Sequence, residues 1–135
     1  EAKAEYMLLP RMLALAEVAW SPLANKDYKN FSEARIPQHL AKLDSRGFNY
    51  RVPVAIGASD TTMDGSHFTI DLAPSVAGAT VYYTLDGYDP RETDLPVTAP
   101  LKILVPDHHT IDLKSIVITP TGKRSVVADM KLQNK

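Results

Sequence analysis

The sequence predicts an α+β chain in which two N-terminal helices are followed by an antiparallel, immunoglobulin-like β-sandwich. Apolar residues recur at three- and four-residue spacing up to about Gly47 and at two-residue spacing from Tyr50 onward. Short segments in the second part are separated by proline- and glycine-rich turns. With 44% hydrophobic and 23% charged residues in 135, the composition is typical of a globular domain. We therefore expect a helical part, residues 1–49, and a β-sandwich, residues 50–135.

The first helical segment begins at Ala2 and ends at Ser21-Pro22. Pro10 fits a first helical turn because its missing N–H leaves nothing unsatisfied there, so we expect the helix to restart at Pro10-Arg11. Apolar residues occupy almost its whole circumference, namely Leu8, Leu9, Met12, Leu13, Leu15, Ala16, Val18, Ala19 and Trp20. Such a helix is expected to be buried on most sides. Its polar residues Arg11 and Glu17 would then each need a hydrogen-bonded partner.

A second helix is predicted from about Phe31 to Arg46. Asn30 is the expected N-cap, Glu33 completes a capping box, and Gly47 lies just beyond the end. Because Pro37 lies inside this span, we expect a kink or a short break there.

Alternating apolar residues predict at least five strands, near residues 67–72, 80–85, 101–105, 109–119 and 125–132. Residues 120–123, Pro-Thr-Gly-Lys, join the last two strands as a hairpin. Apolar residues occupy both strand faces around Ser115, which indicates either burial on both faces or a bulge. Five short strands over about 85 residues favour an antiparallel sandwich.

Two helices alone cannot bury the apolar surface between Leu8 and Trp20, and the sandwich covers one side at most. We therefore expect a larger N-terminal domain to be the missing partner, and the chain to be a piece of a longer protein. Without that partner, we expect self-association through the helix that bears Met12, Leu13 and Trp20.

Several classes of function are excluded or disfavoured by composition. The formal charge of −1, from 15 Lys and Arg against 16 Asp and Glu, gives no electrostatic basis for nucleic-acid binding. The absence of cysteine excludes disulfides and Cys-based zinc sites. The longest nearly apolar stretch, Ala14 to Trp20, is too short for a membrane span. His108 and His109 are adjacent at a strand start and point to opposite faces, so we expect no metal site there.

Four carboxylates lie in one turn-rich segment, and they are Asp86, Asp89, Glu92 and Asp94. Asp-Gly and Asp-Pro pairs are typical of turns, so we interpret these residues as turn residues rather than as acid–base catalysts. Tyr82 and Tyr88 are the candidates for stacking on a sugar ring. Tyr82 lies on the strand face opposite Val81, and Tyr88 lies at a loop tip.

A longer pattern resembles a known family. The segment Leu9–Pro22 is followed by Tyr28–Phe31, Arg35, His39-Leu40, Leu43-Asp44 and Gly47–Arg51. This order resembles the end of the catalytic domain in glycoside hydrolase family 20, the β-N-acetylhexosaminidases. In that family a Pro-Arg opens the final long helix of a TIM-type barrel and an Ala-Glu-x-x-Trp ends it. The resemblance implies that residues 1–49 are the last helices of a truncated barrel, in which Arg11, Glu17 and Trp20 have a scaffold role.

The β part resembles the small sandwich that follows the barrel in many bacterial members. The segment Val81–Pro90 is similar to its Tyr-Thr-x-Asp-Gly-x-x-Pro turn through Asp86, Gly87 and Pro90, and Gly122–Ser125 is similar to its closing hairpin.

The resemblance also implies a reaction. In family 20 the acetamido oxygen of the sugar attacks its own anomeric carbon, while an Asp-Glu pair orients the amide and protonates the leaving oxygen. This chain contains no Asp-Glu dipeptide. The resemblance therefore implies a non-catalytic C-terminal fragment, without cofactor or metal, of a bacterial extracytoplasmic enzyme that hydrolyses terminal β-linked N-acetylhexosamine.

Two roles for the β-sandwich remain open. If it is a structural buttress of the barrel, we expect a broad apolar patch on the helices. As a carbohydrate-binding module it would carry a cluster of coplanar exposed aromatic residues on one sheet face. We prefer the buttress.

Overall fold

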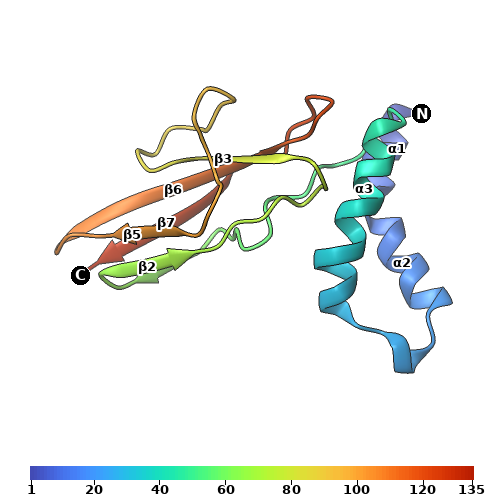
Figure 1. The fold of residues 1–135 in the computed structure, drawn as a ribbon, viewed down its shortest axis with the longest axis horizontal. Coiled ribbons are helices and arrows are strands. Elements are labelled where there is room, and N and C mark those ends of the chain that lie inside the picture. The colour runs from blue at the N-terminus through green and yellow to red at the C-terminus, as the bar shows by residue number, and fades with distance from the viewer.

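A computed structural model describes residues 1–135 and places the helices at one end and the strands at the other (Figure 1). The helices are α1 (Ala2–Leu8), α2 (Arg11–Trp20) and α3 (Ile36–Ser45), with a 3₁₀ turn at Leu23–Asn25 and a π-helical segment at Asn30–Arg35. The strands are β1 (Thr62–Asp64), β2 (His67–Ile70), β3 (Thr80–Thr84), β4 (Leu95–Pro96), β5 (Leu101–Leu104), β6 (His109–Ile118) and β7 (Ala128–Asn134). The predicted α+β class is confirmed.

Five strands form one sheet in the order β1-β7-β6-β3-β4, and β2 pairs with β5 in a second sheet. All neighbouring strands are antiparallel except β1 and β7, which are parallel. The prediction of a wholly antiparallel arrangement is therefore wrong at one edge. The chain enters β1 from the helical end, and β7 runs away from the same end, so the two strands share one direction (Figure 1).

The predicted strands are all present, with shifted ends. The last one begins at Ala128 instead of Ser125, although Ser125 still pairs with Val117. Its amide donates to the Val117 carbonyl, and its hydroxyl accepts from the Val117 amide, both at 2.9 Å. Strands β1 and β4 were not predicted. They are three and two residues long, and all their residues are exposed, so they carry no alternating pattern.

The ladder between β6 and β7 ends at the pair of Ser115 and Ala128, and pairing resumes between Ile118 and Arg124. Two residues of β6 therefore face three of the partner segment, so a bulge lies beside Ser115, in the segment before β7. Ser115 and Val117 are buried on the face that meets the second sheet, while Ile116 and Ile118 are buried on the opposite face. Burial on both faces, the other expectation from the sequence, is confirmed.

One hydrophobic core continues from the sheets into the helical part. The five-stranded sheet contributes Val81, Leu113, Val117, Met130 and Leu132, and the second sheet contributes Phe68, Ile70 and Ile103. Leu40 of α3 belongs to the same cluster, as do Tyr50, Val52, Ala55 and Val76. Since Leu40 is fully buried there, α3 is fastened to the sheets by apolar packing.

The first helical segment breaks and restarts at Pro10 and ends at Ser21, as predicted. The expectation that it is buried on most sides is wrong for this chain, since neither α1 nor α2 contains a buried residue. Only Leu9 and Leu13 pack partly against the core. The rest of the apolar circumference has no element to cover it.

The second helix starts earlier than predicted, at Tyr28. Asp27, rather than Asn30, caps it, because its carboxylate accepts a hydrogen bond from the Asn30 amide at 3.1 Å. The predicted capping box with Glu33 is absent. The irregularity expected at Pro37 takes the form of the π-helical segment directly before it, and α3 then continues to Ser45, with Gly47 beyond its end as predicted.

Candidate functional site

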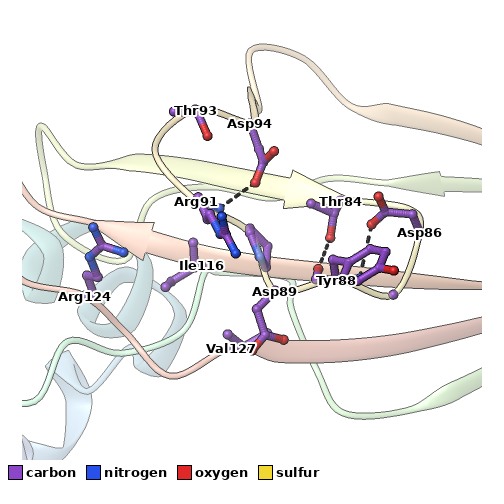
Figure 2. Close-up of a pocket in the computed structure, with 12 residues that line it drawn as sticks. Thr84, Asp86, Tyr88, Asp89, Arg91, Thr93, Asp94, Ile116, Arg124 and Val127 are labelled. Carbon is purple, nitrogen blue, oxygen red and sulfur yellow. Dashed lines mark hydrogen bonds between the residues drawn. The ribbon is translucent and has the colours of Figure 1, made fainter.

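The loop between β3 and β4, residues 85–94, borders a hollow of ≈ 830 Å³ on the outer face of the five-stranded sheet. Figure 2 shows Tyr88 and Asp86 at one end of this hollow and Arg124 at the other. The remaining lining residues are Thr84, Gly87, Asp89, Pro90, Arg91, Thr93, Asp94, Ile116 and Val127. We call this the loop hollow.

Hydrogen bonds within the loop set its shape. The Tyr88 amide donates to Asp86 Oδ1 at 3.1 Å, and the Arg91 amide donates to Asp94 Oδ2 at 2.6 Å (Figure 2). The Thr84 hydroxyl donates to the Tyr88 carbonyl at 2.5 Å. Gly87 lies between them with φ +80°, a conformation that glycine adopts without a Cβ penalty. Asp86 and Asp94 therefore act as turn residues, as the sequence indicates.

Two ion pairs fasten the loop to the sheet. Asp89 accepts from Lys114 of β6 at 3.0 Å, and Glu92 accepts from Arg124 at 2.9 Å. The hydrogen bond to Asp89 raises the pKa of Lys114. Each of the four carboxylates thus has a donor within the chain. No group of three or more His, Asp or Glu side chains is arranged to hold a metal ion.

The structure does not bring the two candidate tyrosines together. Tyr88 is 76% exposed at the loop tip, whereas Tyr82 is half-buried and lines a separate hollow beside Gly78 and Ile118. Tyr82 does lie on the predicted outer face, opposite Ile116. Among the Phe, Trp and Tyr residues of the β part, Tyr88 alone is exposed, so the coplanar aromatic cluster of a sugar-binding sheet face is missing.

A second candidate is the exposed apolar surface of the helical part. Its large side chains are 51–87% exposed and comprise Met7, Leu8, Met12, Leu15, Val18, Trp20, Leu23 and Tyr28. We call this the apolar helix surface. A hollow of ≈ 320 Å³ opens within it between α2 and the start of the second helix, bordered by Ala14, Val18, Tyr28 and Phe31.

Glu17 lies at the edge of this hollow and pairs with Arg35 through two hydrogen bonds of 3.0 and 2.5 Å. The Arg35 guanidinium also lies 5.2 Å from the centre of the Phe31 ring. The hydrogen bond from Arg35 lowers the pKa of Glu17. Glu17 thus has the hydrogen-bonded partner expected for it, and the pair fastens α2 to the second helix.

The other motif residues have different surroundings. Arg11 is exposed and forms no side-chain hydrogen bond, so its expected partner is absent, because α2 is not buried. Trp20 is 87% exposed and covers nothing within this chain. Pro90 is a buried residue of the loop.

Asp44 has a structural role that was not predicted from the sequence. It is 3% exposed, and its Oδ1 accepts hydrogen bonds from Thr121 at 2.7 Å, Thr119 at 3.1 Å, and Tyr50 and Lys123 at 3.2 Å each. Burial raises the pKa of Asp44, but the hydrogen bonds from Thr121 and Lys123 outweigh this effect and lower it overall. Burial and the Asp44 charge raise the pKa of Tyr50.

A signal for this role was present in the helix pattern. Asp44 follows Leu40 by four residues and therefore shares its buried helix face, where a lone carboxylate requires donors.

None of the helices is both long enough and apolar enough to span a bilayer.

Comparison with known proteins yields no match to a family model. The chain is 32% identical over 136 aligned residues to a protein named beta-hexosaminidase from Porphyromonas gingivalis, and this alignment covers 97% of the chain. It is 31% identical over 106 residues to N,N'-diacetylchitobiase from Vibrio harveyi, which covers 62%. The chain spans only 16% and 11% of these proteins. It is thus similar along its length to a small part of larger proteins of the hexosaminidase type.

Proposed function

We propose that this chain is the non-catalytic C-terminal part of a β-N-acetylhexosaminidase of glycoside hydrolase family 20. Its helices would be the last helices of the catalytic barrel, and its β part would buttress that barrel. The similarity to a beta-hexosaminidase over 97% of the chain, and over 16% of that protein, supports this assignment. The Pro10-Arg11 start and the Glu17 and Trp20 positions of α2 fit the family pattern.

The apolar helix surface is the observation that best supports this proposal. Leu15, Val18 and Trp20 are 67%, 62% and 87% exposed on one short helix. Burying a large apolar side chain stabilises a protein by roughly 1.5–3 kcal/mol, and extended apolar patches are typical of interaction surfaces. The rest of the barrel, packed against α2, would bury these side chains.

Polar contacts hold this surface in a fixed position. Arg35 and Glu17 join α2 to the second helix. The Asn49 amide donates to Glu5 at 3.0 Å and ties α1 to the segment after α3. An interface that is ordered before association loses less conformational entropy on binding.

The acidic residues of the chain fit a supporting role rather than a catalytic one. The loop carboxylates are engaged with the Tyr88 and Arg91 amides, Lys114 and Arg124. In the proposed full-length enzyme, the Asp-Glu pair of the barrel would protonate the leaving oxygen. The substrate's acetamido oxygen would attack the anomeric carbon, with net retention after hydrolysis. We propose terminal β-linked N-acetylhexosamine as the substrate and an extracytoplasmic location in a bacterium.

The test compares the 135-residue chain with the polypeptide that its complete gene encodes. Both are assayed for release of 4-nitrophenol from the N-acetyl-β-D-glucosaminide and N-acetyl-β-D-galactosaminide, with the β-D-glucoside as control. We expect the full-length polypeptide to hydrolyse at least one hexosaminide and the chain to hydrolyse none. Turnover by the chain alone, or no hexosaminidase activity in the full-length polypeptide, would refute the proposal.

A further inference from the structure

The loop hollow has a feature that a buttress role does not require, because it presents an aromatic ring to solvent from a rigid loop. Tyr88 is 76% exposed, although large aromatic side chains are usually covered. Its backbone amide and carbonyl are both held, the first by Asp86 and the second by Thr84. Surface ion pairs of Asp89 with Lys114 and of Glu92 with Arg124 add further contacts between the loop and the rest of the chain. The ring is therefore displayed from a fixed backbone.

Unused polar groups line the hollow beside this ring. Asp86 and Asp94 each use one carboxylate oxygen within the loop and keep the other free. The Arg91 guanidinium forms no hydrogen bond within the chain and lies between Tyr88 and Arg124 in Figure 2. The hollow thus combines one aromatic surface with both acceptors and a donor. Its volume of ≈ 830 Å³ is within the usual range of small-molecule sites, about 300–1,000 Å³.

We propose that Tyr88, with Asp86, Arg91 and Asp94, forms a binding subsite for a neutral sugar ring of a glycan. The apolar C–H face of a pyranose would stack on the Tyr88 ring, and its hydroxyl groups would donate to the free carboxylate oxygens and accept from Arg91. The other ligand classes fit less well. Free carboxylates repel phosphate or sulfate groups, and only three of the 12 lining residues are hydrophobic, which disfavours an apolar peptide.

This subsite is independent of the buttress role, because it lies on the sheet and shares no residue with the apolar helix surface. A single ring with few polar contacts binds weakly by itself. Such a subsite would act by raising the local concentration of a glycan near the enzyme that carries it.

The experiment is an NMR titration of the ¹⁵N-labelled 135-residue chain with tri-N-acetylchitotriose and, separately, with cellotriose. We expect saturable shifts centred on the amides of Gly87, Tyr88 and Arg91 with at least one of the two trisaccharides. Tyr88→Ala should weaken binding about tenfold, whereas Tyr88→Phe, which keeps the aromatic face, should bind like the wild type. Because Tyr88 is exposed, both variants should retain the wild-type spectrum elsewhere.

Tyr28→Ala is the matched control, since Tyr28 is 83% exposed but lies on the helical part. We expect it to leave trisaccharide binding unchanged. The proposal is overturned if neither trisaccharide gives saturable shifts at the loop, if Tyr88→Ala binds as tightly as the wild type, or if Tyr28→Ala weakens binding to the same extent. The hydrolysis assay of the proposed function does not depend on any of these results.

Discussion

The carboxylate of Asp44, at the end of α3, accepts a hydrogen bond of 2.7 Å from the hydroxyl of Thr121, which lies 77 residues further along the chain. Thr119 and Lys123 of the same turn donate to the same oxygen. The Lys123 ammonium also lies 5.7 Å from the centre of the Tyr50 ring. This polar cluster joins the helical part to the turn between β6 and β7, beside the apolar contact made by Leu40.

Removal of this carboxylate should destabilise the whole chain. We expect Asp44→Ala to lower the free energy of unfolding by about 3 kcal/mol, because it leaves buried hydroxyl groups and the partly buried Lys123 without their acceptor. Urea unfolding followed by circular dichroism measures the change. The control is Asp71→Asn, an exposed aspartate without a side-chain hydrogen bond, which should stay within about 0.5 kcal/mol of the wild type. Equal effects of the two variants would contradict the role of Asp44.

The same cluster predicts a pH dependence. The pKa of Asp44 is lowered in the folded chain from its ordinary value of 3.8, so its contribution to stability is complete above that value and is lost as the pH falls through the folded pKa. Asp44→Asn removes the titrating group. The stability difference between the wild type and this variant should therefore be constant above about pH 5 and shrink below about pH 4. Unfolding curves across this range provide the test, and a constant difference down to the lowest pH would count against it.

The pair between Glu17 and Arg35 predicts a local effect. Glu17→Gln removes the charge that fastens α2 to the second helix, so amide hydrogen exchange should accelerate in α2 but not in β6 or β7. Because the Arg35 side chain is 40% exposed, the effect on global stability should be smaller than that of Asp44→Ala. Glu33→Gln, at an exposed glutamate without a partner, is the control. Unchanged exchange in α2 of Glu17→Gln would show that the pair is not what holds this helix.

The apolar helix surface predicts self-association of the chain on its own. Leu15 and Leu95 are matched in exposure, at 67% and 65%, but Leu15 lies on α2 and Leu95 on the edge strand β4. Sedimentation velocity should show concentration-dependent association that Leu15→Gln weakens roughly tenfold and Leu95→Gln leaves unchanged. A wild-type chain that stays monomeric at high concentration would refute this prediction.

The strands of the core could be predicted because each carries its own alternating pattern. Phe68 and Ile70, or Val81 and Tyr83, face the core at two-residue spacing, and this is visible within a few residues. In contrast, β1 is held by backbone pairing with β7, and the Lys131 amide donates to the carbonyl of Thr61, directly before β1, at 2.9 Å. Its own residues are exposed and show no pattern. Edge strands that form by pairing with residues far along the chain therefore cannot be predicted from the local sequence pattern.

The helix start was mispredicted because Asp27 and Asn30 are both good capping residues and lie three positions apart. The Asp27 carboxylate reaches the Asn30 amide, so the helix begins a turn earlier and widens into the π-helical segment before Pro37.

The candidate sites were predictable only in part. The turn motif around Asp86 and Gly87 marked the loop, and Tyr88 was placed at its tip. The hollow itself also needs Arg124 and Val127, which only the folding of the sheet brings beside the loop. The Asp44 cluster depends in the same way on residues 75 to 79 positions away.

The central claim is that α2 packs against the rest of the catalytic barrel in the full-length enzyme, and hydrogen–deuterium exchange tests it most directly. The exchange of the Arg11–Trp20 amides is compared between the 135-residue chain and the polypeptide encoded by the complete gene. We predict that these amides exchange at least about tenfold more slowly in the full-length polypeptide, while the amides of β6 and β7 are little changed. Equally fast exchange of α2 in both polypeptides would contradict the claim.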